Sequence, residues 1–189
     1  MLEVSRPLTY EEFLRVREAT NDQTELIGGE LFVTPSPSSL HQAVIHRLTR
    51  AIDFALDERG SGLVFFAPLD VRLAPDTVVQ PDILILLDDR MEAIVEDAVE
   101  GAPSMVIEVL SPSTNRRDLT LKRNLYAAHG VTEYWLADPR GKIVTVHADP
   151  VGGHYQSMVT SLDTATSVLL PAVSFDVTKL FAPISPLRQ

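Results

Sequence analysis

The sequence predicts an α/β fold in which helices flank a central mixed β-sheet. Residues 39–59 and 115–129 repeat their apolar side chains with helical spacing. The runs 82–87 and 105–110 are apolar at almost every position, which is typical of strands that helices cover on both faces. With a further strand at 63–73, the order along the chain is helix, three strands, helix, strand, and this order favours an α/β sandwich.

The N-terminal part adds a helix and two strands to this core. Thr9 and Glu12 have the spacing of a capping box, which predicts a short helix over 10–17. Residues 25–33 are expected to form two short strands joined by a tight turn at Gly28 and Gly29. The long helix at 39–59 follows, and Gly60 stands where a C-terminal cap is expected.

The C-terminal part adds hairpins. The acidic segment 88–101 is expected to hold a short helix or a loop, and the second long helix is expected to end at Gly130. Beyond it, the apolar alternation predicts four more strands, over 133–137, 142–148, 154–160 and near 167–170.

Composition limits the class of protein. The 189 residues are 45% hydrophobic and 22% charged, as expected for one globular domain over 1–189. The absence of cysteine excludes disulfides, thiolate zinc sites and cysteine nucleophiles. The start of the chain lacks the pattern of a secretory signal, and the most apolar run is far shorter than the roughly 20 residues of a membrane span. We therefore expect a cytoplasmic protein without a membrane partner.

The net charge of −10 limits how the chain can bind nucleic acid. Asp and Glu outnumber Lys and Arg by 26 to 16, whereas proteins that bind nucleic acid usually carry a basic surface. Any such contact needs a local basic patch, metal ions that offset the charge, or a partner subunit.

Glu108 is the first candidate site residue, because it is the one carboxylate within the apolar strand at 105–110. An ionised carboxylate is costly to bury without a cation. The alternatives to a functional role are a structural ion pair, or an edge strand on which Glu108 faces water.

Asp82 is the second candidate. Pro81 and Asp82 begin the apolar run that precedes the strand of Glu108; a Pro-Asp pair alone is most often a turn. If the two strands are neighbours, both carboxylates can bind a hard cation such as Mg²⁺, which prefers oxygen ligands.

Lys122 is the third candidate. On a helical wheel it lies near the middle of an apolar face that also carries Leu119, Leu121 and Tyr126. A lysine in that position either extends its ammonium to solvent or meets a carboxylate, and Glu108 and Asp82 are its natural partners. Two acids, a metal ion and a lysine are the groups that phosphodiester hydrolysis requires.

At this point the sequence resembles a known family, Uma2, which is similar to the PD-(D/E)XK nucleases. The resemblance covers about 25–148 and is most specific at 102–114. Its motifs are Gln80-Pro81-Asp82-Ile83-Leu84, the block 101–114, the run from Asp118 to Lys122 with Tyr126, and the block 130–139.

The resemblance implies a restriction-endonuclease-like core over about 38–139, with Asp82 as the motif aspartate and Glu108 as the second acid. Two residues after Glu108 the chain has Leu110 where the general nuclease pattern has lysine. The resemblance implies that the lysine has moved to the next helix, at Lys122, in agreement with the helical wheel.

The leading hypothesis is therefore a metal-dependent endonuclease or related phosphodiesterase. We expect Mg²⁺ or Mn²⁺ bound by Asp82 and Glu108, nucleic acid as partner with DNA before RNA, and a homodimer. Glu30 and His41 are possible auxiliary residues, although a surface glutamate and a core histidine are the plainer readings. The alternatives are a catalytically inactive nuclease-fold protein that binds nucleic acid or protein, and a purely structural Asp–Lys–Glu cluster.

Overall fold

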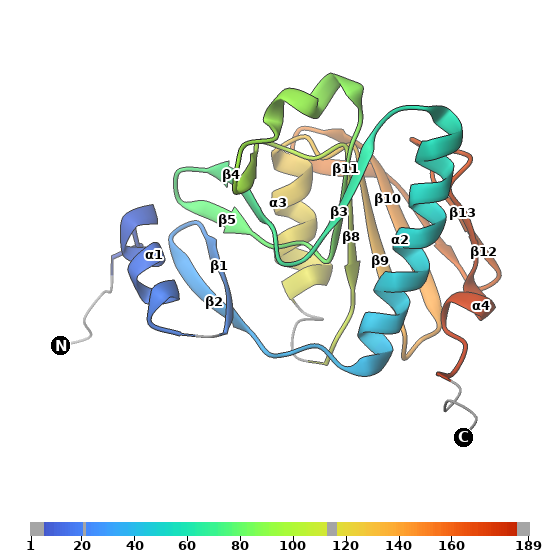
Figure 1. The fold of residues 1–189 in the computed structure, drawn as a ribbon, viewed down its shortest axis with the longest axis horizontal. Helices are drawn as coiled ribbons and strands as arrows, with labels where there is room; N and C mark the ends of the chain where they lie inside the picture. Colours follow the sequence, from blue (N-terminus) through green and yellow to red (C-terminus); the bar gives the residue numbers. More distant parts are fainter. Residues whose placement is uncertain (1–5, 21, 113–116, 185–189) are drawn as a thin grey trace.

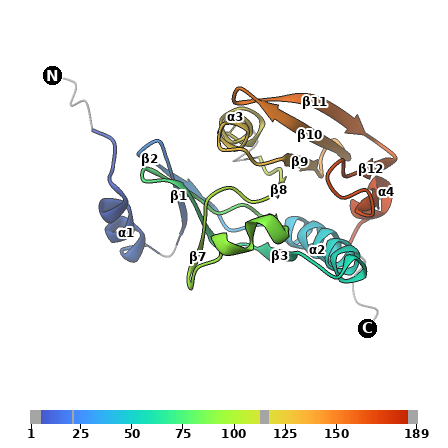
Figure 2. The same cartoon turned by 90° about the horizontal axis from the view of Figure 1, so that it is seen from above.

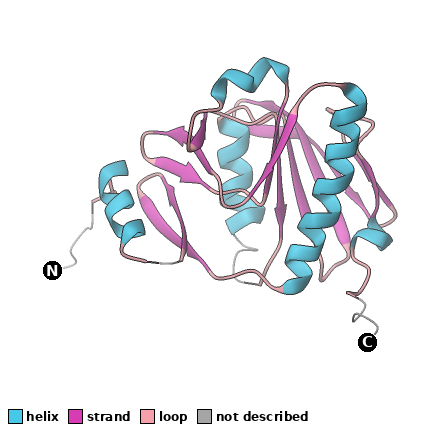
Figure 3. Cartoon of the chain, viewed as in Figure 1, coloured by secondary structure: helices cyan, strands magenta, loops and turns pink. Residues whose placement is uncertain are grey.

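The computed structural model describes residues 6–20, 22–112 and 117–184, which form strands and helices in layers (Figures 1 and 3). The helices are α1 (Tyr10–Glu18), α2 (Ser39–Arg59), a 3₁₀ helix (Asp88–Ala93), a π-helical turn (Arg117–Lys122), α3 (Arg123–Ala128) and α4 (Val177–Leu180). The strands are β1 (Gln23–Ile27), β2 (Glu30–Thr34), β3 (Leu63–Phe66), β4 (Asp70–Ala74), β5 (Thr77–Val79), β6 (Ile83–Leu86), β7 (Ala98–Glu100), β8 (Met105–Val109), β9 (Glu133–Asp138), β10 (Ile143–Val151), β11 (His154–Ser161), β12 (Thr164–Thr166) and β13 (Ser174–Asp176). No helix in these described stretches is long and apolar enough to cross a membrane.

The central sheet is mixed, as the sequence predicts. Its six strands follow the order β11-β10-β9-β8-β6-β3. The pair β8 and β9 is parallel, and the other neighbours in this sheet are antiparallel. The strand of Asp82 and the strand of Glu108 are therefore adjacent.

Helices cover both faces of this sheet, with α2 on one side and α3 on the other (Figure 2). Val44, Leu48 and Ile52 of α2 are fully buried and pack in one cluster with Ile83 and Ile107 of the sheet. The alternate strand residues, such as Leu84 and Val106, pack instead with Tyr126 of α3. Burial of one such side chain stabilises the fold by about 1.5–3 kcal/mol, so the two-sided apolar strands fix the sandwich.

A second sheet lies at the N-terminal end of the molecule, beside α1 (Figure 1). Its strands follow the order β2-β1-β5-β4-β7. The predicted capping box of α1 is present, with Thr9 and Glu12 exchanging hydrogen bonds. Phe13 of α1 packs with Leu26 and Val78 of this sheet in a small third cluster. The N-terminal strands thus form their own layer and also supply one wall of the site described below.

Two local predictions were wrong and a third was incomplete. Residues 63–73 are not one strand but two, because β3 joins the central sheet and β4 joins the second sheet. The segment 88–101 holds the expected short helix, as a 3₁₀ helix, and in addition β7, which was not predicted and pairs parallel with β4. Residues 167–170 are not a strand; the C-terminal ribbon is β12 with β13. The predicted start of the second long helix, Asn115, lies outside the described residues.

Glu133 anchors the C-terminal ribbon to the central sheet. Its side chain is fully buried in β9. Its Oε2 accepts hydrogen bonds from the backbone N–H groups of Val168 (2.8 Å) and Leu169 (2.7 Å), and its Oε1 accepts one from the Trp135 indole. Three hydrogen-bond donors compensate this carboxylate, and no Lys or Arg of the described residues forms an ion pair with it, so it acts as a structural acceptor.

Replacing Glu133 tests this anchor. In Glu133→Gln, an amide N–H₂ replaces one accepting oxygen and leaves at least one donor without an acceptor. The free energy of unfolding should fall by about 1–3 kcal/mol, as measured by urea denaturation. Asp163→Asn, at an exposed carboxylate close to the same ribbon, is the control and should not change the stability. Equal stability of the two variants would contradict the anchoring role.

Candidate functional site

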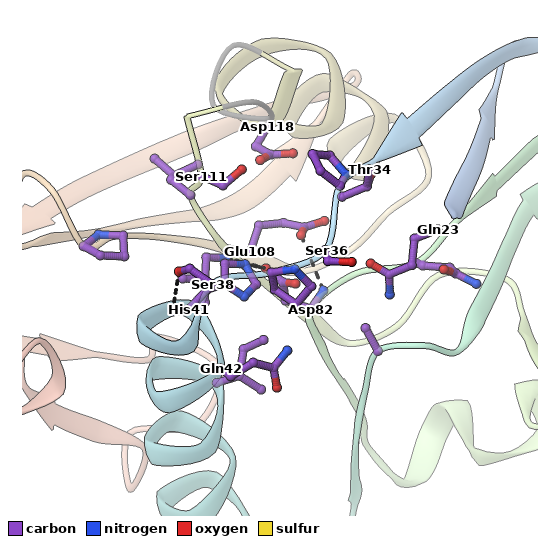
Figure 4. A pocket seen from close by; sticks show the side chains of 18 of the residues that line it. Gln23, Thr34, Ser36, Ser38, His41, Gln42, Asp82, Glu108, Ser111 and Asp118 are labelled. Carbon is purple, nitrogen blue, oxygen red and sulfur yellow. Dashed lines mark hydrogen bonds and ion pairs between the residues drawn. The ribbon is translucent and has the colours of Figure 1, made fainter. Parts of the chain in front are cut away.

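A cavity of about 390 Å³ lies where β6 and β8 meet the beginning of α2 (Figure 4). Asp82, Glu108 and Lys122, the three residues singled out in the sequence, all line it. The cavity also contains further polar side chains from β1, the β2–α2 connection, the first turn of α2, the β5–β6 connection, the residues after β8 and the π-helical turn, namely Gln23, Glu25, Ser36, Ser38, His41, Gln42, Gln80, Ser111, Arg117 and Asp118.

Sheet register brings the two predicted acids together. Ile83 pairs with Ile107 across the antiparallel strands β6 and β8, which places Asp82 opposite Glu108. The backbone N–H of Asp82 lies 3.4 Å from Glu108 Oε2, and the Asp82 Oδ2 accepts a 2.7 Å hydrogen bond from the backbone N–H of Val109. The two carboxylates therefore lie side by side at the end of a fixed strand pair.

Lys122 reaches Glu108 from the helical side. Its Nζ lies 2.8 Å from Glu108 Oε1, and Tyr126 donates a 3.0 Å hydrogen bond to the same oxygen. Burial, together with the charges of Asp82, Asp118 and Glu25, raises the pKa of Glu108 above its ordinary value, against the opposing effect of the Lys122 ammonium. The Glu108 carboxyl is thus held in a place where negative charge is in excess.

The ammonium of Lys122 is held in its charged form. Burial lowers its pKa, but the charges of Glu108, Glu25 and Asp118 outweigh burial and raise the pKa above its ordinary value. A lysine in this state donates hydrogen bonds and positive charge, and it is poorly suited to accept a proton.

Glu25 and Asp118 complete the charged cluster, and the sequence reasoning assigned them no role. Glu25, in β1, is 2.8 Å from Lys122 Nζ through Oε1 and 3.4 Å from Arg117 through Oε2. Asp118 Oδ1 lies 3.8 Å from Lys122 Nζ. One signal was available for Glu25: it stands beside Leu26 and Ile27 in a strand, as Glu108 stands in its own apolar run. Three carboxylates, Glu25, Glu108 and Asp118, therefore lie around the Lys122 ammonium, and Glu25 also contacts Arg117.

The two auxiliary candidates lie in different places. His41 is in the first turn of α2 and lines the cavity, with its Nε2 3.1 Å from Asp82 Oδ2. Burial lowers its pKa, but the hydrogen bond and charge of Asp82 outweigh burial, and the net pKa is raised. Glu30 is exposed at the start of β2, pairs with Ile27 in the hairpin, and is not among the cavity residues.

The helical wheel placed Lys122 correctly and two of its neighbours wrongly. Lys122 is buried, but Leu119 and Leu121 are 41% and 39% exposed. Asp118 is buried in their place. The reason is the π-helical turn over Arg117–Lys122: its i→i+5 hydrogen bonding shifts the side chains away from the α-helical phase that the wheel assumes.

The side chains of the cavity can be compared with the ligands that a metal ion prefers. Within 6–20, 22–112 and 117–184, no group of three or more His, Asp or Glu side chains is arranged to hold a metal. Asp82 and Glu108 nevertheless offer oxygen ligands from two adjacent strands, in a cluster where acids outnumber cations. Mg²⁺ commonly uses one or two carboxylates and retains several waters. The residues present therefore fit a cation with two protein ligands.

The fold and this acidic cavity define a nuclease-like α/β protein. The family model of Uma2, described as "Putative restriction endonuclease", matches residues 10–179. The chain therefore belongs to the Uma2 family.

A solved structure has the same fold. It is a "putative nuclease belonging to DUF820" from Anabaena variabilis, 23% identical to this chain, with a TM-score of 0.77 over 93% of this chain and 98% of that one. Among curated proteins, no match is found.

Substitution of Lys122 and of Glu108 should affect the stability of the protein differently. Lys122→Met leaves Glu25, Glu108 and Asp118 without their shared ammonium, so the free energy of unfolding should fall by about 3–5 kcal/mol. Glu108→Gln removes a charge whose burial is unfavourable, while Lys122 keeps Glu25 at 2.8 Å; stability should stay unchanged or rise. Urea denaturation at neutral pH measures both. Strong destabilisation by Glu108→Gln would indicate a structural cluster instead of a functional site.

Proposed function

We propose that this protein hydrolyses phosphodiester bonds of nucleic acid with a divalent cation, Mg²⁺ or Mn²⁺. The observation that carries the proposal is the meeting of Asp82 and Glu108 from adjacent strands with the Lys122 ammonium in one open cavity. Membership of Uma2 supports the same reaction class. Asp82 and Glu108 are the proposed ligands of the cation.

Each side chain of the site has a separate role in this proposal. A bound divalent cation would polarise the phosphate and lower the pKa of a coordinated water. Lys122, charged at neutral pH, stabilises negative charge that develops on the phosphate oxygens. Tyr126 and the Val109 N–H hold the carboxylates of Glu108 and Asp82 in fixed orientations. His41 contacts the same Asp82 oxygen as the Val109 N–H and also helps to orient this carboxylate.

A second candidate function is a catalytically inactive nuclease fold that binds nucleic acid or protein. The net charge of −10 favours it, because a strongly acidic chain repels a polyanionic substrate. The displaced lysine also favours it, because Leu110 stands where the nuclease pattern has its catalytic amine. This candidate predicts no turnover and no specific cation binding at Asp82 and Glu108.

The type of nucleic acid, the cellular location and the oligomeric state stay predictions. A preference for DNA over RNA and a cytoplasmic location rest on the sequence alone. A homodimer also stays a prediction: β11 and β3 are the outer strands of the central sheet, and open strand edges can pair with another chain.

Substitution of the proposed ligands tests the reaction. Asp82→Asn and Glu108→Gln should each lower the hydrolysis of DNA or RNA by about 100-fold or more. Each substitution removes a proposed ligand of the cation that stabilises negative charge at the reacting phosphate. Both should also abolish Mn²⁺ binding in calorimetry. Glu30→Gln, outside the cavity, is the matched acidic control and should behave as the wild type. Activity that survives both ligand substitutions would exclude this mechanism.

His41 provides a graded test of the same site. His41→Ala removes the side chain that orients Asp82, so the affinity for Mn²⁺ and the activity should both fall about 10- to 100-fold, as is usual for a partner of a metal ligand. His46→Ala, on the exposed side of the same helix, should change neither. Calorimetry with Mn²⁺ is the measurement, and unchanged affinity in His41→Ala would assign His41 to packing alone.

A further inference from the structure

Phe66 is an aromatic residue in an unusual place. It ends β3, its side chain is 59% exposed, and it lines the same cavity as Asp82 and Glu108. Exposing an aromatic ring forgoes the stabilisation that burial would give it. The ring belongs to no buried cluster of the fold, so its position requires an explanation outside core packing.

The backbone fixes Phe66 next to the acids. Phe66 pairs with Ile83 across β3 and β6, and the backbone N–H of Ala67 donates a 3.1 Å hydrogen bond to the Asp82 carbonyl. Phe66 therefore lies directly across from Ile83, the residue that follows Asp82. Leu63, at the other end of β3, is also exposed but does not line the cavity.

The remaining lining combines apolar and hydrogen-bonding groups. Pro35, Pro37 and Leu40, from the connection between β2 and α2 and from α2 itself, add apolar surface. Amide and hydroxyl side chains lie around the acids in the same cavity, among them Gln23, Ser36, Ser38 and Gln42 (Figure 4). A nucleobase has the matching character, with apolar faces that stack on aromatic rings and polar edges that exchange hydrogen bonds.

The net charge of the protein favours single-stranded over duplex nucleic acid as the ligand. Affinity for duplex nucleic acid depends mainly on contacts of Lys and Arg with many phosphates, and this chain has a net charge of −10. Among the residues that the structure describes, the Lys and Arg side chains that line the cavity are Arg117, Lys122 and Arg140. Stacking of an unpaired base supplies binding energy that does not depend on a long basic surface.

We propose that the cavity binds an unpaired nucleotide. Its base stacks on Phe66, and its phosphate is directed to the divalent cation proposed at Asp82 and Glu108. The protein then prefers single-stranded nucleic acid, or an unpaired end or loop, over intact duplex. This inference rests on the proposed function, since it names the substrate class of the same site. Phe66 is a specificity-determining residue and takes no part in the hydrolysis itself.

Binding of a short fluorescein-labelled oligonucleotide tests the inference. Phosphorothioate linkages resist hydrolysis, so fluorescence anisotropy in Mg²⁺ reports binding alone. Phe66→Ala should weaken binding of the single strand by about 5- to 150-fold, and Phe66→Trp should retain it. Leu63→Ala, at the other exposed position of β3, is the matched control and should bind as the wild type. The same sequence as a duplex should bind more weakly, and DNA and RNA single strands should respond alike to Phe66→Ala.

Several results would overturn the inference. These are unchanged single-strand affinity in Phe66→Ala, duplex bound at least as tightly as single strand, or no binding of either. A shift in sedimentation on Phe66→Ala without any change in oligonucleotide binding would assign the ring to self-association at the β3 edge. Equal hydrolysis of single-stranded substrate by wild type and Phe66→Ala would reject the role of Phe66 in substrate preference and leave the proposed function intact. Absence of all hydrolysis would reject the proposed function, while the binding measurement still decides on Phe66.

Discussion

The site depends on a single buried ammonium. Lys122 lies 2.8 Å from both Glu25 and Glu108, and these three residues come from β1, β8 and the π-helical turn. Without that charge, carboxylates from separate elements would repel one another in a place where water cannot screen them. The same contact links the N-terminal sheet to the central sheet, in addition to the apolar packing of Val71 and Val79 against Leu84.

The sequence predicted most of the central fold because its signal was local. The stripe of α2 and the two-sided apolar runs of β6 and β8 follow directly from periodicity, and both proved correct in type and position. The division of residues 63–73 between two sheets could not be predicted in this way. Strand propensity is a property of a short segment, whereas the choice of sheet depends on partners far away in the chain.

In the candidate site too, residues with a local sequence signal were predicted, and residues brought in by contacts between distant segments were missed. Glu108 and Lys122 were found because each is a polar residue at a position that the pattern reserves for apolar ones, and Asp82 because it begins the apolar strand that precedes the strand of Glu108. Glu25 contacts Lys122 as closely as Glu108 does, yet it lies outside the predicted core. Only the packing of β1 against the π-helical turn shows that it belongs to the cluster. Phe66 likewise has no sequence signal, since an aromatic residue in a strand is normally assigned to the core.

The π-helical turn has a consequence for the permitted length of the chain. Removing one residue between Asp118 and Lys122 would return this segment to ordinary α-helical winding and rotate Asp118 and Arg117 by about 100° relative to Lys122 and α3. Asp118 and Arg117 would then leave their places in the cluster although every side chain of the cluster was still encoded. Tolerance to insertion and deletion should therefore be low in the π-helical turn.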